Sequence, residues 1–208
     1  MIKVRLEKLN LDDFTQHLFD QLGMSDWPLA CRDKGRKVLE IMYSILKNKK
    51  RDQGTSFIYH PIDVALMLIN KFNVKDPRII MVALLHDVVE QDMVAAERNI
   101  TEKLGKSYLK DVWKLTKEYI AFGRVKEIDD DQKYFKKIRR AGNDLFIVKL
   151  SDRISNLKEL SECGDPSKIK KYLSDLDTFY IPLAVVKSKY NQRIKKLLSN
   201  ILEERMRF

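Results

Sequence analysis

One segment constrains the fold of this chain more than any other: the apolar run from Ile79 to Leu85. Asp76, just before it, is typical of a helix N-cap, and Pro77 suits the first position of a helix. Because the run is apolar on nearly every side, the helix is expected to be buried rather than to lie at the surface. We therefore predict a central helix from Arg78 to about Gln91.

The rest of the sequence is also expected to be helical. The chain has only 7 Gly and 5 Pro in 208 residues, and its apolar side chains recur at helical spacing. This length is typical of one domain, so we predict a single all-α domain over residues 1–208. The other expected helices cover 12–22, 28–47, 61–72, 95–104, 107–119, 131–141, 143–160, a stretch that ends at 180, and 182–206, with surface loops at 52–56 and 123–131.

The charge and composition of the chain limit the classes of partner that it is expected to bind. The formal net charge is +10, which raises the local concentration of anions without choosing among them. The basic residues are spread along the expected helices and no nucleic-acid motif accompanies them, so nucleic acid is not expected as the partner. Met1–Asn10 lacks the apolar core of a targeting segment, and Cys31 and Cys163 form no CxxC pair. We predict a cytoplasmic protein with no membrane association.

Candidate chemistry lies where polar side chains interrupt apolar runs. His86 and Asp87 end the central apolar run, Asp152 follows a second one, and His60 stands just before a helix. A buried carboxylate needs a partner, because burying it unpaired is costly. Taken singly, each histidine could be a hydrogen-bonded core residue, and Asp152 could form a structural ion pair with Arg153. Together, four ligand-type side chains on three helices indicate a divalent cation.

The sequence motifs around these residues resemble those of a known protein family. Arg51 and Gly54, followed by the stretch from Phe57 to Ala65, are similar to R-x-x-G-x-x-Y-x-x-HP-x-x-VA; Leu84–Glu90 is similar to LHDVVED, and Val148–Leu157 to VKLADRLHNM. These are motifs of HD phosphohydrolases, and in particular of the hydrolase domain of RelA/SpoT alarmone enzymes and their small single-domain relatives. The segments 115–117 and 180–184 fit the same family. The resemblance covers about residues 35–190.

The resemblance implies a multi-helix HD-domain bundle with a central metal site. Its usual metal is Mn²⁺, whose octahedral coordination would keep open positions beside four protein ligands. Such a cation makes water a better nucleophile and neutralises charge on phosphorus. The ligands that the resemblance implies are His60, His86, Asp87 and Asp152.

The resemblance also implies a substrate, namely a small phosphorylated nucleotide. In this family the reaction is removal of the 3′-pyrophosphate of (p)ppGpp. Glu90 would act as general base or position the attacking water, with Gln91 beside it as a second catalytic residue. Arg51, Asn156 and Arg153 would bind the nucleotide.

Besides Phe57, which stands in place of the tyrosine of the first motif, four residues depart from the family pattern. Gln91 replaces an aspartate, Asp52 a lysine, Ser155 a histidine and Glu159 a threonine. Carboxylates near a polyphosphate disfavour its binding. Two alternatives therefore stay open: a phosphohydrolase for another nucleotide, such as a nucleoside phosphate or NADPH, or a catalytically weak nucleotide-binding or interaction protein. Arg51 could also be a solvated loop residue, and Asn156 could form a hydrogen bond between helices.

Overall fold

The computed structural model describes residues 5–51, 54–127, 130–160 and 165–208. Asp52, one of the four departures from the family pattern, lies outside them, as does Cys163. The expected all-α class is confirmed. The helices are α1 (Leu11–Gln21), α2 (Leu29–Leu46), α3 (Tyr59–Asn70), α4 (Pro77–Leu85), α5 (Val88–Gln91), α6 (Met93–Lys103), α7 (Lys106–Leu115), α8 (Asp131–Arg140), α9 (Asn143–Leu160), α10 (Pro166–Asp175), α11 (Ile181–Ser188) and α12 (Gln192–Arg205), with short turns η1 (Leu6–Lys8), η2 (Met24–Asp26) and the π-helical η3 (Leu176–Tyr180).

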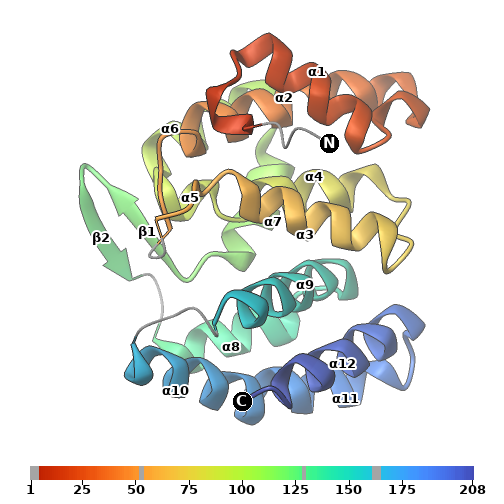
Figure 1. Ribbon diagram of the computed structural model, residues 1–208, viewed down its shortest axis with the longest axis vertical. Coiled ribbons are helices and arrows are strands. Elements are labelled where there is room, and N and C mark those ends of the chain that lie inside the picture. The colour runs from red at the N-terminus through yellow and green to blue at the C-terminus, as the bar shows by residue number, and fades with distance from the viewer. Residues whose placement is uncertain (1–4, 52–53, 128–129, 161–164) are drawn as a thin grey trace.

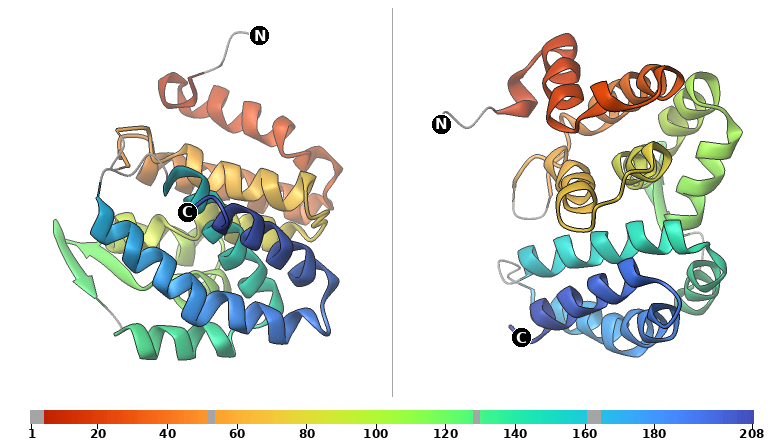
Figure 2. Two further views of the ribbon diagram at one scale, coloured as in Figure 1. Left: turned by 60° about the horizontal axis from the view of Figure 1, so that its bottom comes forward. Right: turned by 90° about the vertical axis from the view of Figure 1, so that its right-hand side faces the viewer.

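The helices stack in layers along the long axis of the molecule (Figure 1). α1 packs on α2, α2 on α4, and α3 and α4 together on α9. The right-hand view of Figure 2 shows α9 between the α3–α4 layer and the α11–α12 pair. One cluster of buried apolar side chains runs from Leu6 to Ile201 through all of these layers. α4 and α9 therefore lie at the centre of the core; α9 carries Asp152 of the predicted metal site, and α4 ends directly before His86 and Asp87.

The predicted helix 78–91 is wrong in one respect, because it is interrupted at its centre. α4 begins as expected, with Asp76 accepting a hydrogen bond from the Arg78 N–H, but it ends at Leu85. The Nδ1 atom of His86 lies 2.6 Å from the carbonyl oxygen of Ala83. That carbonyl would accept from residue 87 in an unbroken helix, so the imidazole competes with the backbone for it. The interruption holds His86 and Asp87 in a turn between two helices.

The expected helix 107–119 and loop 123–131 are also corrected. α7 ends at Leu115, and β1 (Glu118–Ala121) pairs antiparallel with β2 (Arg124–Glu127). The turn between the strands has positive φ at Phe122 (51°) and Gly123 (72°), as a two-residue type I′ hairpin turn requires. The hairpin stands out from the helices beside α5 and α6 (Figure 1).

Two further boundaries differ from expectation. The segment 182–206 is two helices, because Asn191 caps a new one by accepting from the N–H groups of Arg193 and Ile194. α6 begins at Met93, two residues earlier than expected. Across the described ranges, each helix is either too short or too polar to cross a bilayer. Cys31 is a free, half-buried thiol.

Asp92, which follows Gln91, has a structural role. Its Oδ1 accepts a hydrogen bond of 3.1 Å from the Ala95 N–H and so caps α6. We expect Asp92→Ala to lower the free energy of unfolding by about 1 kcal/mol, the usual value of such a cap. Urea denaturation measures this, with Glu102→Ala at an exposed site of the same helix as the control. Equal midpoints for the two variants would contradict the assignment.

Candidate metal centre

The four predicted ligands come together between three parts of the chain. His60 lies in the first turn of α3, His86 and Asp87 form the turn after α4, and Asp152 lies in the middle of α9. His60 Nε2 is 3.1 Å from Asp152 Oδ1 and 3.6 Å from Asp87 Oδ2. His86 Nε2 is 3.1 Å from Asp87 Oδ1 and 3.7 Å from Asp152 Oδ1. All four side chains are at least nine-tenths buried by residue.

Both imidazoles present the same nitrogen to the cluster. The Nδ1 of His86 donates to the Ala83 carbonyl oxygen, and the Nδ1 of His60 lies 3.3 Å from the Ser155 hydroxyl. Each Nε2 therefore faces the carboxylates, the arrangement in which an imidazole binds a metal through one nitrogen and is oriented through the other. His86 Nε2 is buried and has no hydrogen bond of acceptable geometry within the described ranges. A polar atom left in this way is a sign of a missing partner.

The donor set fits a divalent cation. Ligand atoms of His60, His86 and Asp152 all lie within 4.8 Å of one another, and Asp87 adjoins both imidazoles. Two imidazole nitrogens and two carboxylates suit a first-row divalent ion. The structure thus contains a potential metal site.

Electrostatics in the cluster depend on close opposite charges. Burial alone would lower the pKa of His86, but the carboxylates of Asp87 and Asp152 raise it to about 9. Burial would raise the pKa of Asp152, yet Lys149 and the two imidazoles hold it well below its ordinary value. The Lys149 ammonium is buried and lies 2.9 Å from Asp152 Oδ2. The negative charge of Asp152 is therefore balanced from two sides.

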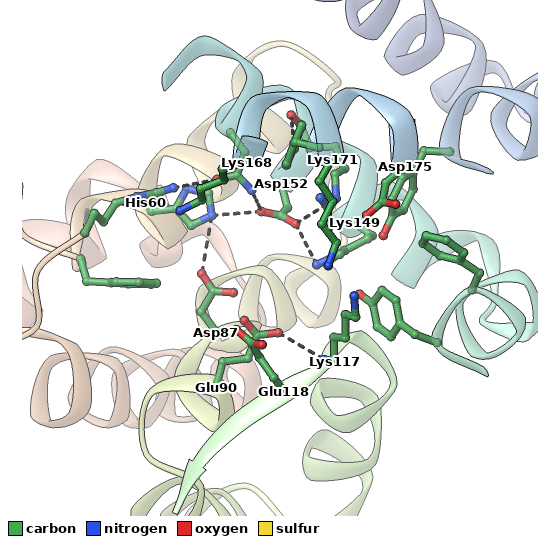
Figure 3. Close-up of a pocket in the computed structure, with 18 residues that line it drawn as sticks. His60, Asp87, Glu90, Lys117, Glu118, Lys149, Asp152, Lys168, Lys171 and Asp175 are labelled. Atoms are coloured by element: carbon green, nitrogen blue, oxygen red, sulfur yellow. Dashed lines mark hydrogen bonds and ion pairs between the residues drawn. The ribbon is translucent and has the colours of Figure 1, made fainter. Parts of the chain in front are cut away.

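The cluster opens into a cavity of about 310 Å³ (Figure 3). That volume is in the range of small-molecule sites. Asp87 and Glu90 lie on one side of it, and Lys168 and Lys171 of α10 on the other. Further basic residues in its lining are Arg51, Lys117, Lys149 and Arg153. Positive side chains around a metal-type cluster suit a phosphorylated ligand.

Of the two predicted catalytic residues, the structure brings one to this cavity. Glu90 projects into it from α5 and accepts a 3.4 Å hydrogen bond from the Lys117 backbone N–H. Loss of hydration and the charge of Asp87 raise the pKa of Glu90 to about 8. Gln91 lines a different cavity, with Asp92 and Lys49. Its catalytic role remains a prediction.

The predicted nucleotide contacts Arg51 and Asn156 form a chain that ends at the metal-type cluster. Arg51 Nη2 donates to Asn156 Oδ1 at 2.7 Å, and Asn156 Nδ2 donates to Asp152 Oδ1 at 2.6 Å. Glu159 lies 3.1 Å from Arg51 Nε. Asn156 thus joins the Arg51 loop to α9, rather than one helix to another as its alternative interpretation expects, and its contact with a nucleotide stays a prediction. The Arg51 Nη1 atom is buried and has no partner within the described ranges.

Arg153, the third predicted nucleotide contact, lines the cavity beside aromatic rings. Its guanidinium lies 4.8 Å from the ring centre of Tyr172 and 4.7 Å from that of Tyr180. The suspected ion pair with Asp152 is loose, since Arg153 Nε is 4.0 Å from Asp152 Oδ2. This Nε is buried and without a hydrogen-bond partner in the part of the chain that is described.

Four lysines that line the cavity were not predicted from the sequence, namely Lys117, Lys149, Lys168 and Lys171. Lys149 could have been found from the sequence, because it interrupts the apolar run from Phe146 to Leu150 and a buried lysine needs a carboxylate partner. The other three are indistinguishable in sequence from the lysines of solvated helix faces and turns. Only the folded structure shows that Lys168 and Lys171 of α10, and Lys117 between α7 and β1, line this cavity.

Comparison with known proteins identifies the family. Residues 38–187 match the sequence profile of the HD domain. The chain belongs to the HD domain family. It is 34% identical over 149 residues to a guanosine-3′,5′-bis(diphosphate) 3′-pyrophosphohydrolase of Aquifex aeolicus, a match that covers 68% of this chain and 20% of that protein. The chain thus corresponds to about a fifth of this relative.

Other relatives of the HD domain chain are closer to it in length. It is 22% identical over 159 residues to the mouse (Mus musculus) guanosine-3′,5′-bis(diphosphate) 3′-pyrophosphohydrolase MESH1, a match that covers 76% of this chain and 86% of the mouse protein. A solved structure of a metazoan ortholog of SpoT that hydrolyses ppGpp has the same fold, with a TM-score of 0.63 and 19% identity. That match covers 86% of this chain and 97% of the other.

The position of Asn156 between Arg51 and Asp152 predicts a structural role. We expect Asn156→Ala to lower the free energy of unfolding by about 1–3 kcal/mol, because the half-buried Arg51 and the buried Asp152 each lose a hydrogen bond. Asn200→Ala on α12 is the control, since within the described ranges its amide bonds only to the Lys196 carbonyl of its own helix. Both variants replace a helical Asn by Ala, so both change helix propensity by the same amount. Thermal or urea unfolding measures both. Equal stabilities would exclude the bridging role.

Proposed function

We propose that this HD domain protein is a metal-dependent nucleotide phosphohydrolase that removes the 3′-pyrophosphate of (p)ppGpp. The observation that carries the proposal is the buried cluster of His60, His86, Asp87 and Asp152, which opens into a cavity lined by basic side chains as well as by the carboxylates of Glu90, Glu118 and Asp175. The reaction named for the Aquifex and mouse relatives supports the choice of substrate. We place the reaction in the cytoplasm and treat residues 1–208 as one domain.

We infer that the four residues of the cluster hold Mn²⁺. The imidazoles would bind through Nε2, and the carboxylates of Asp87 and Asp152 would balance the added charge. When bound, the cation supplies Lewis-acid chemistry, which acidifies water and neutralises charge on the phosphate under attack. Lys149 keeps Asp152 ionised and in place for this task.

In this proposal the side chains around the cluster bind the substrate and move protons. The nucleotide phosphates would bind the guanidinium groups of Arg51 and Arg153, which line the cavity, with Lys171 nearby and Asn156 fixing the orientation of Arg51. Glu90 would take the proton of the attacking water at a carboxylate oxygen. Its pKa of about 8 leaves it mostly protonated at neutral pH, so positive charge at the cluster is needed to return it to the base form.

A second candidate substrate is favoured by one observation. Glu159 occupies one side of the Arg51 guanidinium at 3.1 Å, which leaves fewer donors for a guanine nucleotide than a neutral residue would. Another nucleoside phosphate or NADPH would then be the substrate of the same site. A catalytically weak nucleotide-binding protein is the remaining alternative.

The proposed reaction predicts that the Mn²⁺-loaded protein releases pyrophosphate from ppGpp. His60→Ala and Asp87→Ala are expected to abolish the release, whereas His17→Ala, on an exposed face of α1, retains it. Chromatography of products from ppGpp, GTP, ATP and NADPH is the measurement. Release of phosphate from one of the other nucleotides would instead support the second candidate substrate. Tight binding of ppGpp without turnover would show that the chain is a nucleotide-binding protein and not a hydrolase.

The position of Glu90 predicts a separable effect on catalysis. Glu90→Gln is expected to lower kcat by roughly 10²–10⁴-fold, the range for loss of a general base, without loss of bound Mn²⁺. Gln91→Ala is the matched variant: its side chain lines the other cavity, so we expect less than a roughly tenfold loss of kcat. Steady-state kinetics with metal analysis tests both. A larger loss for Gln91→Ala would restore its predicted catalytic role.

The electrostatics of His86 predict that metal binding competes with protons. Its pKa of about 9 means that the imidazolium must lose a proton before Nε2 can bind an ion. The affinity for Mn²⁺ is therefore expected to rise roughly tenfold per pH unit up to about pH 9. Calorimetry in buffers of different ionisation enthalpy measures the released proton. An affinity independent of pH below that value would refute the linkage, and His17→Gln serves as the control for general charge effects.

A further inference from the structure

A second cavity, of about 360 Å³, lies between α5, α6 and the tip of the β1–β2 hairpin. Its lining includes Lys49, Gln91, Arg98, Ile120 and Phe122. None of its lining residues also lines the cavity of the metal-type cluster. The two cavities nevertheless adjoin the same short helix, since Glu90 of α5 projects into one and Gln91 into the other. This second cavity has the volume of a small-molecule site.

The charges in the second cavity favour an anion. Lys49 is half-buried and Arg98 is exposed, and neither has an ion pair or side-chain hydrogen bond within the described ranges. This differs from the first cavity, where Arg51 and Lys149 are held by carboxylates. The one carboxylate among the described lining residues, Asp92, uses Oδ1 to cap α6. Two cations that converge on one hollow without a partner attract phosphate-type groups.

Phe122 gives an independent indication of a ligand. Its φ of 51° lies in the left-handed region, where the type I′ turn would be better served by Asn, Asp or Gly. The residue is 87% exposed and does not belong to the apolar core. A strained backbone and an exposed aromatic ring at one position are typical of a functional surface. A flat ring beside cations suits a nucleobase, because stacking on an aromatic side chain stabilises any base.

We propose that the second cavity binds a nucleoside polyphosphate. Lys49 and Arg98 hold its phosphates, Phe122 stacks on its base, and the Gln91 amide offers a donor and an acceptor to its polar edge. The site is separate from the proposed hydrolytic site and does not depend on hydrolysis. Because both sites share α5, a nucleotide in the second cavity contacts the segment that carries Glu90.

The test uses GTP, which lacks a 3′-pyrophosphate and so the bond that the proposed reaction breaks. Photolabelling with 8-azido-GTP, followed by peptide mass spectrometry, locates the bound base. We expect the fragmentation spectra to place the label on the residues Gln91 or Phe122 themselves, and not on their neighbours Glu90 and Glu118 of the first cavity, with competition by unlabelled GTP. Labelling confined to residues that line the first cavity would overturn the proposal, whether or not ppGpp is hydrolysed.

A pair of variants tests the role of the cations. Arg98→Gln is expected to weaken GTP binding roughly tenfold or more in calorimetry, as loss of a charged phosphate contact does. Lys110→Gln removes the same charge at an exposed position of α7 and is expected to leave the affinity within about twofold. An equal loss of GTP affinity in the two variants would show that only the net charge of the protein matters, and it would contradict a binding site at Arg98.

A third variant tests the ring without a risk to folding. Asn is well suited to the position of Phe122 in a type I′ turn, so Phe122→Asn is expected to preserve the hairpin. It should weaken the binding of GTP several-fold and leave the binding of inorganic tripolyphosphate unchanged, because only GTP has a base to stack. An unchanged affinity for GTP would overturn the assignment of Phe122.

Discussion

The structure depends on the burial of charge at the centre of an apolar core. Asp152 lies within α9, where it is 3% exposed, and an isolated carboxylate there would be strongly destabilising. It is held by Lys149 from its own helix, by His60 from α3 and by the Asn156 amide. Together with His86 of the α4–α5 turn, whose Nε2 lies 3.7 Å from Asp152 Oδ1, these contacts require α3, the turn and α9 to meet at one point. The same contacts therefore hold the three layers together and fix the geometry of the site.

Much of this centre could be predicted from sequence, because local signals and side-chain chemistry agreed. Asp76 and Pro77 marked the start of α4, and polar residues inside apolar runs indicated which carboxylates and imidazoles converge. The interruption at His86 could not be predicted, since it arises when a ring competes for the Ala83 carbonyl. The hairpin was also missed: its Phe-Gly turn lacks the usual Asn or Asp signal.

Ion pairs between residues far apart in the chain could not be predicted from the sequence either. Arg51 and Glu159 are more than a hundred positions apart, and nothing local indicates that they form an ion pair. The departures from the family pattern at Ser155 and Glu159 acquire a meaning only in three dimensions. Ser155 lies against His60 Nδ1, and Glu159 against the arginine that is expected to meet the nucleotide. Both substitutions thus act on the surroundings of the site rather than on the ligand set.

The turn at the end of α4 also limits which insertions and deletions this region can tolerate. His86 is fixed relative to the buried face of α4, and each residue added to or deleted from a helix rotates all later positions by about 100°. A single insertion between Pro77 and Leu85 would carry His86 and Asp87 away from α3 and α9 together. The hairpin tip, by contrast, can lengthen without moving a buried group. Natural variation in length should accordingly be nearly absent from α4.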